Sequence, residues 1–197
     1  MFNPPPSDLH KRDPLIYTCS AGQIWYRSYQ VSHGPIFFGK GKLYRWDSPT
    51  GDYGVLYLGA DEYCAFIESI GRGVLKTRFV SASVLRQRTF SKVLVKGNLR
   101  LIDMVNSGGL ARLGAEGSIV SGTGYRNSQR WSATLKDHPS KPDGIYYRSR
   151  HDPARTSCAL FDSSAGMIEV AQTYASWAAE KTLLGAILDN YHFGTDL

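Results

Sequence analysis

The chain has 197 residues, a length typical of one domain, and 42% of them are hydrophobic and 12% aromatic, enough to form a buried core. Lys and Arg number 23 against 17 Asp and Glu, so the formal net charge is +6. No apolar stretch approaches the roughly 18 residues of a membrane span, and the first residues lack the apolar core of a secretory signal. These features exclude, as first interpretations, a membrane protein, a disulfide-rich secreted scaffold and a disordered chain.

The cysteines and histidines give no indication of a metal site. The cysteines are odd in number and widely spaced, the five histidines stand singly, and no paired Cys or His spacing occurs; the cysteines are Cys19, Cys64 and Cys158. We therefore expect no metal, and the reducing cytoplasm is the expected compartment.

The first part of the chain reads as a lead-in, two strands and a long loop. Residues 1–21 contain a proline triplet and mixed charge, and we expect them to be an extended lead-in to a single domain over 22–197. The aromatic, β-prone run at 24–29 predicts a strand. A loop rich in Gly, Pro, Asp and Ser covers 34–54, and loops of that length in compact domains are usually functional or disordered. The apolar run at 55–58, bounded by glycines, predicts a strand buried on both faces.

A helix is predicted to begin at Asp61 and to end near Ile70, because Gly71 and Gly73 follow. Its apolar residues recur at helical spacing and should face the core. They are Tyr63, Phe66, Ile67 and Ile70. Cys64, Ala65 and Glu68 are expected on a different side.

The remaining segments favour an α+β fold. Strands are predicted within 74–104 and over 144–150, 158–162 and 167–174, and helices near 105–113, 128–136 and 178–190. Segments 144–150 and 158–162 are expected to pair antiparallel across a turn. Many short strands with few helices indicate α+β and not a doubly wound sheet.

Basic residues are concentrated in one segment. Residues 72–100 carry eight Lys and Arg and no acid. Such a segment can face an anionic partner, or it can be the solvated face of strands whose acidic partners lie elsewhere in the fold. Aromatic residues are not interleaved with these bases as a stacking surface for nucleic acid would require.

Arg45 and Tyr57 are the first candidate site residues. Arg45 lies in the long loop, where its fork of donors could hold a phosphate or pyrophosphate; the alternative is an ion pair with Asp47 or Asp52. Tyr57 alternates with leucines in the predicted strand, so its ring could line a pocket and stack on a ligand, or it could pack in the core.

Glu68 is the strongest candidate for a catalytic residue. It stands alone in an uncharged stretch of the predicted helix, with small residues one turn before it. A carboxylate there could stabilise an oxocarbenium-like centre or bind a ribose hydroxyl. The alternative is an exposed i,i+4 pair with Arg72.

Ser149 is expected in the middle of a strand, on one face with Tyr147 and His151. A serine near a histidine suggests a hydrolase. Nucleophilic serines usually lie on sharp turns, so a hydrogen-bonding role is the better interpretation of this residue.

Taken in order, these segments resemble the RES domain family. The matching stretches are IWYRSY at 24–29, LYRWDSPTGDYGVLYLG at 43–59, FIES at 66–69, DGIYYRSR to CALFD at 143–162, and the C-terminal LLGAILDNYHFGTDL. The resemblance implies that Arg45, Glu68 and Ser149 are the catalytic residues and that Tyr57 binds substrate. Tyr26 and Arg27 match an aromatic–arginine pair that also binds substrate. Tyr44 stands where many members have glycine.

The resemblance also implies a fold, an activity and a partner. The fold would be like that of ADP-ribosyltransferase toxins, a split, mainly antiparallel β core with flanking helices. The activity would be a toxin's cleavage of the nicotinamide–ribose bond of NAD⁺, as a glycohydrolase or phosphorylase, with NAD⁺ as substrate and no other cofactor. The partner would be a Xre-type helix-turn-helix antitoxin, and homo-oligomers are common in the family. The open alternatives are mono-ADP-ribosylation of a protein and, more remotely, a non-enzymatic module that binds nucleic acid.

Overall fold

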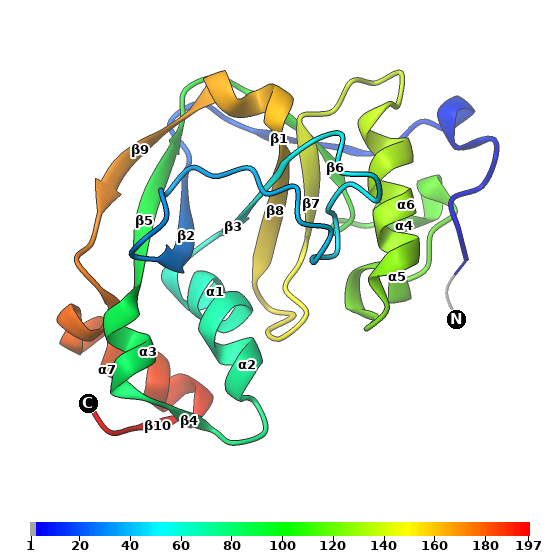
Figure 1. The fold of residues 1–197 in the computed structure, drawn as a ribbon. Coiled ribbons are helices and arrows are strands. Elements are labelled where there is room, and N and C mark those ends of the chain that lie inside the picture. Colours follow the sequence, from blue (N-terminus) through cyan, green and yellow to red (C-terminus); the bar gives the residue numbers. More distant parts are fainter. Residues whose placement is uncertain (1–2) are drawn as a thin grey trace.

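The computed structural model describes residues 3–197 and is built around one curled sheet of eight strands (Figure 1). Its strands are β1 (Ile16–Cys19), β2 (Ile24–Gln30), β3 (Val55–Gly59), β5 (Arg88–Val95), β6 (Leu99–Asp103), β7 (Gly144–Arg148), β8 (Thr156–Phe161) and β9 (Ile168–Thr173). Their order is β1-β6-β7-β8-β3-β2-β5-β9, and every neighbouring pair is antiparallel except β6 and β7. Two short strands, β4 (Phe79–Val80) and β10 (Gly194–Thr195), pair separately. The predicted α+β class with a mainly antiparallel core is confirmed.

The sheet divides between β2 and β3. These two strands pair only at Tyr26 and Gly59, whereas β2 pairs with β5 along its whole length. From this pair toward Gln30 of β2 and Val55 of β3 the two halves of the sheet diverge, and the long loop over 34–54 crosses the divergence (Figure 1). This is the split core that the family resemblance implied.

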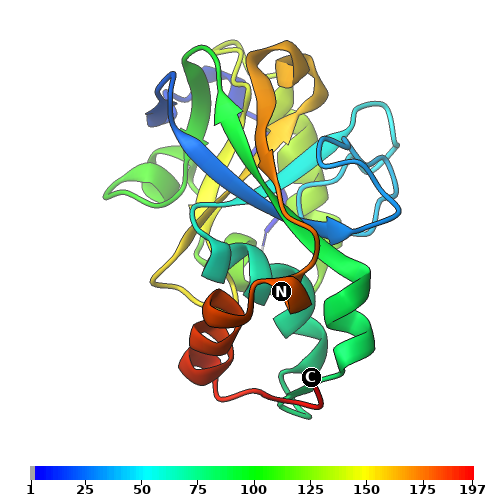
Figure 2. The same ribbon diagram turned by 90° about the vertical axis from the view of Figure 1, so that its left-hand side faces the viewer.

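Helices flank the sheet in two groups (Figures 1 and 2). One group is α4 (Gly109–Leu113), α5 (Ser118–Ser121) and α6 (Tyr125–Lys136), and the other is α1 (Glu62–Phe66), α2 (Arg72–Val74), α3 (Ala82–Gln87) and α7 (Lys181–Tyr191). Short 3₁₀ turns lie at Leu9–Lys11, Asp162–Met167 and Trp177–Ala179. The first group covers a core around Trp46, Trp131 and Phe161, and the second covers one around Phe66, Phe90 and Trp177.

The helix predicted from Asp61 begins as expected and ends later than expected. The Asp61 carboxylate accepts a hydrogen bond from the Cys64 amide and so caps α1. The helix then passes through a π-helical turn, η2 (Ile67–Gly71), into α2 instead of ending at its glycines. A Cβ at Gly71 would lie 2.5 Å from Ile67 Cδ1 and 3.2 Å from the Phe193 ring, so this glycine allows close packing and does not stop the helix.

Two short helices and the first strand depart from expectation. Helix α3 lies within the segment predicted as strands only, and α5 was not predicted. Both have six residues or fewer, too short for helical periodicity to show in the sequence. The segment 1–21, expected as an extended lead-in, contributes β1 to the sheet and the fully buried Leu9 to the core.

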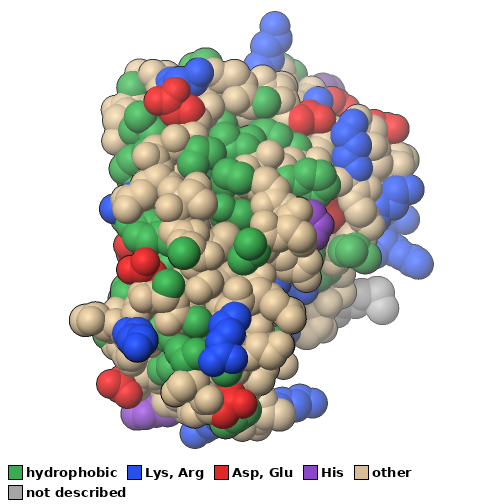
Figure 3. Space-filling model, turned by 60° about the vertical axis from the view of Figure 1, so that its left-hand side comes forward, with side chains coloured by type: hydrophobic (Ala, Val, Ile, Leu, Met, Phe, Trp, Pro, Cys, Tyr) green, Lys and Arg blue, Asp and Glu red, His purple; other side chains and the backbone are tan. Residues whose placement is uncertain are grey.

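The basic residues do not gather into a stripe on the face shown in Figure 3. There, Lys and Arg side chains are scattered among hydrophobic and acidic ones. Over residues 3–197, no helix combines the length and the hydropathy that crossing a membrane requires.

Candidate active site

Glu68 lies in the π-helical turn η2, and its carboxylate is held by a turn more than 80 residues later in the chain. Oε1 accepts hydrogen bonds from Ser149 Oγ at 2.5 Å, from the Arg150 amide at 2.9 Å and from the His151 amide at 3.4 Å. Within residues 3–197 no hydrogen bond reaches Oε2. One oxygen is therefore fixed, and the other is available to a ligand. The alternative ion pair with Arg72 is not formed.

Ser149 meets Glu68, but it does not lie in mid-strand. Strand β7 ends at Arg148, and Ser149 begins the turn to β8; the prediction of a mid-strand position was wrong. The serine is 2% exposed, donates its hydroxyl hydrogen to Glu68 and accepts a hydrogen bond from the Asp152 amide at 3.1 Å. A hydroxyl with both functions engaged orients a carboxylate, which agrees with the hydrogen-bonding role and not with a nucleophile.

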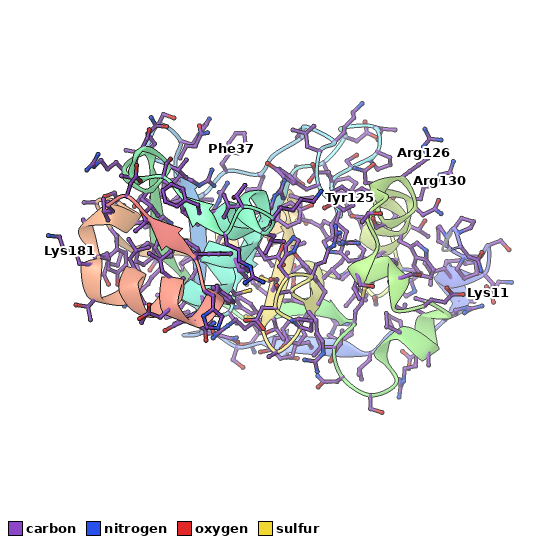
Figure 4. The ribbon with its side chains drawn as sticks, turned by 90° about the horizontal axis from the view of Figure 1, so that it is seen from below. Lys11, Phe37, Tyr125, Arg126, Arg130 and Lys181 are labelled. Atoms are coloured by element: carbon purple, nitrogen blue, oxygen red, sulfur yellow. The ribbon has the colours of Figure 1, made fainter. Side chains whose placement is uncertain are left out.

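Arg45 is buried and fastens the long loop to the helices beside it. Nη1 donates to the Ile119 carbonyl at 2.9 Å, Nη2 donates to the Gly122 carbonyl at 2.8 Å, and the guanidinium lies 5.1 Å from the Tyr125 ring centre. Figure 4 shows Tyr125 reaching inward from the start of α6, whereas Arg126 and Arg130 of the same helix point outward. The alternative ion pair with Asp47 or Asp52 is absent among the described residues.

The charge of Glu68 contributes to the pKa of Arg45. Burial lowers the pKa of Arg45, while the rings of Tyr125 and Tyr147 and the negative charge of Glu68 raise it. A guanidinium carries five N–H donors, so the two bonds to carbonyl groups leave three for a ligand. Arg45 can therefore fasten the loop and donate hydrogen bonds to an anion at the same time.

Tyr57 supports the same loop from the sheet. Its hydroxyl donates to Asp47 Oδ1 at 2.8 Å and accepts from the Trp46 amide at 2.9 Å, and burial raises its pKa well above the ordinary value. Its ring packs edge-on against Tyr44, with centres 5.7 Å apart. The stacking of Tyr57 on a ligand stays a prediction, and in this structure its ring contacts another residue of the loop.

Tyr44 packs its ring against that of Tyr57 at the surface of the loop. It is 41% exposed, and the Arg72 guanidinium lies 4.9 Å from its ring centre. Sequence analysis named Arg72 only as a partner of Glu68. Residues 72–100 contain no acidic residue, and this could have indicated that Arg72 has no carboxylate partner within its own segment.

Tyr26 and Arg27 lie on opposite faces of β2 because they are adjacent in a strand. Tyr26 packs at the edge of the core around Phe66, and burial together with the negative charge of Glu62 raises the pKa of its hydroxyl. Arg27 donates to the Pro35 carbonyl at 2.8 Å, burial lowers its pKa to about 10, and the neighbouring Tyr44 raises it. Of the pair, Arg27 is the one directed to the loop that holds Arg45.

Charged side chains of both signs act on His151, next to Glu68. Burial is the main cause that lowers the pKa of His151; the charge of Glu68 raises it, and the charges of Arg150, Arg72 and Arg45 lower it further. One carboxylate among several cations suits a ligand with negative phosphates and a site of developing positive charge. Arg150 and His151 follow Ser149 directly; the sequence pointed to His151 only as a neighbour of Ser149, and Arg150 was not expected at the site.

A cavity of about 670 Å³ lies beside the turn that carries Ser149. It shares His151 with the surroundings of Glu68 but is not lined by Glu68, Arg45 or Tyr57. Its lining residues include Asp61, Asp152, Arg155 and Tyr191. Within residues 3–197, no group of three His, Cys, Asp or Glu side chains is arranged to hold a metal ion.

Comparison with known proteins identifies the family of this chain. The family model described as RES domain matches residues 17–180. The chain belongs to the RES domain family. The RES match includes Arg45, Glu68 and Ser149, and it begins within β1.

A solved structure has the same fold as this RES domain. It is the crystal structure of the M. tuberculosis MbcT–MbcA toxin–antitoxin complex, one chain of which is 14% identical, with a TM-score of 0.64 over 85% of this chain and 92% of that one. No curated protein sequence matches. At this identity the likeness establishes the fold alone, the mixed α+β fold with a mainly antiparallel sheet described above.

Proposed function

We propose that this RES domain is the toxin of a toxin–antitoxin pair and that it consumes NAD⁺ by cleaving the nicotinamide–ribose bond. Membership of the RES family and a fold shared with a chain of a toxin–antitoxin complex support the class. The observation that carries the chemistry is the Glu68 carboxylate, held through one oxygen by the turn at Ser149 and open at the other.

The arginines give the substrate its orientation. Arg45 and Arg27 would bind the pyrophosphate with donors that their carbonyl partners leave unused, and Arg72 adds positive charge on the face of Tyr44. Tyr57 acts chiefly by holding the loop in place. The pyrophosphate contacts would fix the ribose carbon near Glu68 Oε2.

Cleavage then needs stabilisation of a cation. The bond between the ribose anomeric carbon and the nicotinamide nitrogen breaks, and nicotinamide leaves neutral with the electron pair. Glu68 Oε2 would accept a hydrogen bond from a ribose hydroxyl and stabilise the oxocarbenium ion, a contact that strengthens in the transition state. Ser149 keeps the carboxylate in place. An oxygen of water or of phosphate forms the new bond to carbon, and an attacking water loses its proton to solvent.

The partner and compartment follow from the same proposal. A toxin of this kind would be neutralised by an antitoxin of Xre type, with helix-turn-helix DNA-binding, and would act in the cytoplasm, where NAD⁺ is available. The positive charge around Glu68 would suit an acidic segment of such an antitoxin.

The test is incubation of the purified chain with NAD⁺, with and without phosphate, followed by quantification of nicotinamide and the mass of the ribosyl product. We expect nicotinamide release and a free product, ADP-ribose if water is the acceptor or its phosphorylated form if phosphate is. ADP-ribose mass found on a protein with little free product would assign protein ADP-ribosylation instead. No release from folded, antitoxin-free chain, together with salt-sensitive nucleic-acid binding that Glu68→Ala leaves unchanged, would assign a binding module.

A further inference from the structure

The turn that holds Glu68 is itself fastened on its other side. Asp152 Oδ2 accepts hydrogen bonds from Arg155 Nε at 2.9 Å and from the Tyr191 hydroxyl at 2.8 Å. The amide of the same Asp152 donates to Ser149 Oγ at 3.1 Å. A single residue therefore connects the serine that contacts Glu68 with the last residue of helix α7.

Arg155 connects this turn to the helix that leads to Glu68. Its Nη1 forms an ion pair with Asp61 Oδ2, while Asp61 Oδ1 caps helix α1 at the Cys64 amide. Helix α1 continues directly into the π-helical turn that carries Glu68. The two segments whose meeting creates the Glu68–Ser149 contact are thus joined a second time, through Arg155.

Burial and aromatic packing make this arrangement more than a surface ion pair. The side chains of Arg155 and Asp152 are 25% and 18% exposed. The Arg155 guanidinium lies 4.4 Å from the Tyr63 ring centre, and the Tyr63 and Tyr191 rings pack edge-on with centres 6.3 Å apart. A guanidinium that bridges two carboxylates beside an aromatic ring has little freedom to rearrange.

We propose that Asp152, Arg155 and Tyr191 are positioning residues for Glu68, and we call them, with Asp61, the turn clamp. The proposal rests on the proposed function. Two of the three donors to Glu68 Oε1 are backbone amides of the turn, so any shift of the turn redirects the carboxylate. The clamp fixes that turn from behind and makes the C-terminal helix part of the active-site framework (Figure 2). A displacement of about 1 Å is enough to lower a rate strongly when a carboxylate must meet a developing cation.

The test removes one hydroxyl. Tyr191→Phe loses the bond to Asp152 and keeps the ring that packs on Tyr63. Tyr63→Phe is the matched control, because within residues 3–197 the Tyr63 hydroxyl makes no hydrogen bond. We expect Tyr191→Phe to lower kcat for nicotinamide release about tenfold, the equivalent of about 1.4 kcal/mol, with KM for NAD⁺ within about twofold. Tyr63→Phe should keep the wild-type kcat.

A second readout does not depend on turnover. Amide hydrogen exchange at Arg150 and His151, followed by NMR, should be about tenfold faster in Tyr191→Phe than in the wild type or in Tyr63→Phe. Asp152→Asn should restore most of the protection that Asp152→Ala loses, because an amide oxygen still accepts the two bonds.

The outcomes separate the two proposals. A wild-type chain that releases no nicotinamide refutes the proposed function, while the exchange data still decide whether the clamp fixes the turn. An active wild type with unchanged kcat and unchanged exchange in Tyr191→Phe overturns the clamp and leaves the function standing. An equal loss of kcat in Tyr63→Phe would show that the loss does not depend on the hydrogen bond from Tyr191 to Asp152, and would also overturn the proposal.

Discussion

The hydroxyl of Tyr57 supports the loop that carries Arg45, and Tyr57→Phe removes that hydroxyl alone. The change leaves the buried Trp46 amide without its acceptor and takes one hydrogen bond from the carboxylate of Asp47, which is 2% exposed. Asp47 Oδ2 still accepts hydrogen bonds from the Leu43 amide at 2.9 Å and from the Tyr44 amide at 3.0 Å. A buried polar group left unpaired costs about 1–3 kcal/mol, so we expect a loss of about 2 kcal/mol in the free energy of unfolding.

That loss is large enough to measure. In a domain of this size 1 kcal/mol corresponds to about 2–4 °C, so the Tm in differential scanning calorimetry should fall by about 4–8 °C. Tyr44→Phe is the control, because Tyr44 is exposed and its hydroxyl makes no hydrogen bond within residues 3–197. The Tm of the Tyr44→Phe protein should stay within about 1 °C of the wild type. A Tyr57→Phe chain with the wild-type Tm and a raised KM for NAD⁺ would refute this reasoning and would make Tyr57 a ligand contact.

Two further predictions concern Arg45 and His151. In Arg45→Lys, the lysine cannot reach both the Ile119 and the Gly122 carbonyl groups. A lost charged hydrogen bond costs about 1.5–3 kcal/mol, so the Tm in calorimetry should fall by at least about 3 °C. An unchanged Tm would contradict the structural role of Arg45. Because the folded-state pKa of His151 lies below its ordinary value of 6.5, the unfolded chain binds more protons, and stability should be full above about pH 6.5 and decline below it. Urea unfolding from about pH 7.5 to about pH 5.5 should show a decline that His151→Gln reduces, and equal declines would remove His151 as its source.

The sequence predicted the parts of the fold that local patterns determine. The strand at 24–29 and the short apolar strand before Gly59 carry their own β signal, and the carboxylate of Asp61 is an N-cap that needs no tertiary context. The path of the helix beyond Ile70 was not predictable in this way. Gly71 is read locally as a helix stop, and its actual role depends on Phe193 at the other end of the chain.

The same distinction applies to the site. Glu68 was selected because it is an isolated charge on an apolar helix, and Ser149 because it stands near a histidine and matches the serine of the resembled family. Their contact joins segments 81 residues apart. The partners of Arg45 are backbone carbonyls 74 and 77 residues away, which no sequence pattern indicates. Candidate residues could therefore be predicted, whereas their hydrogen bonds could not.

The central claim is that the negative charge of Glu68 stabilises the cation formed when NAD⁺ is cleaved, and Glu68→Gln tests it most directly. Glutamine is nearly the same shape, and its amide oxygen can still accept from Ser149 and the Arg150 amide, so the Tm should stay within about 3 °C of the wild type. The rate of nicotinamide release at saturating NAD⁺ should fall by about 10³-fold. A folded Glu68→Gln chain that releases nicotinamide at the wild-type rate would contradict the account.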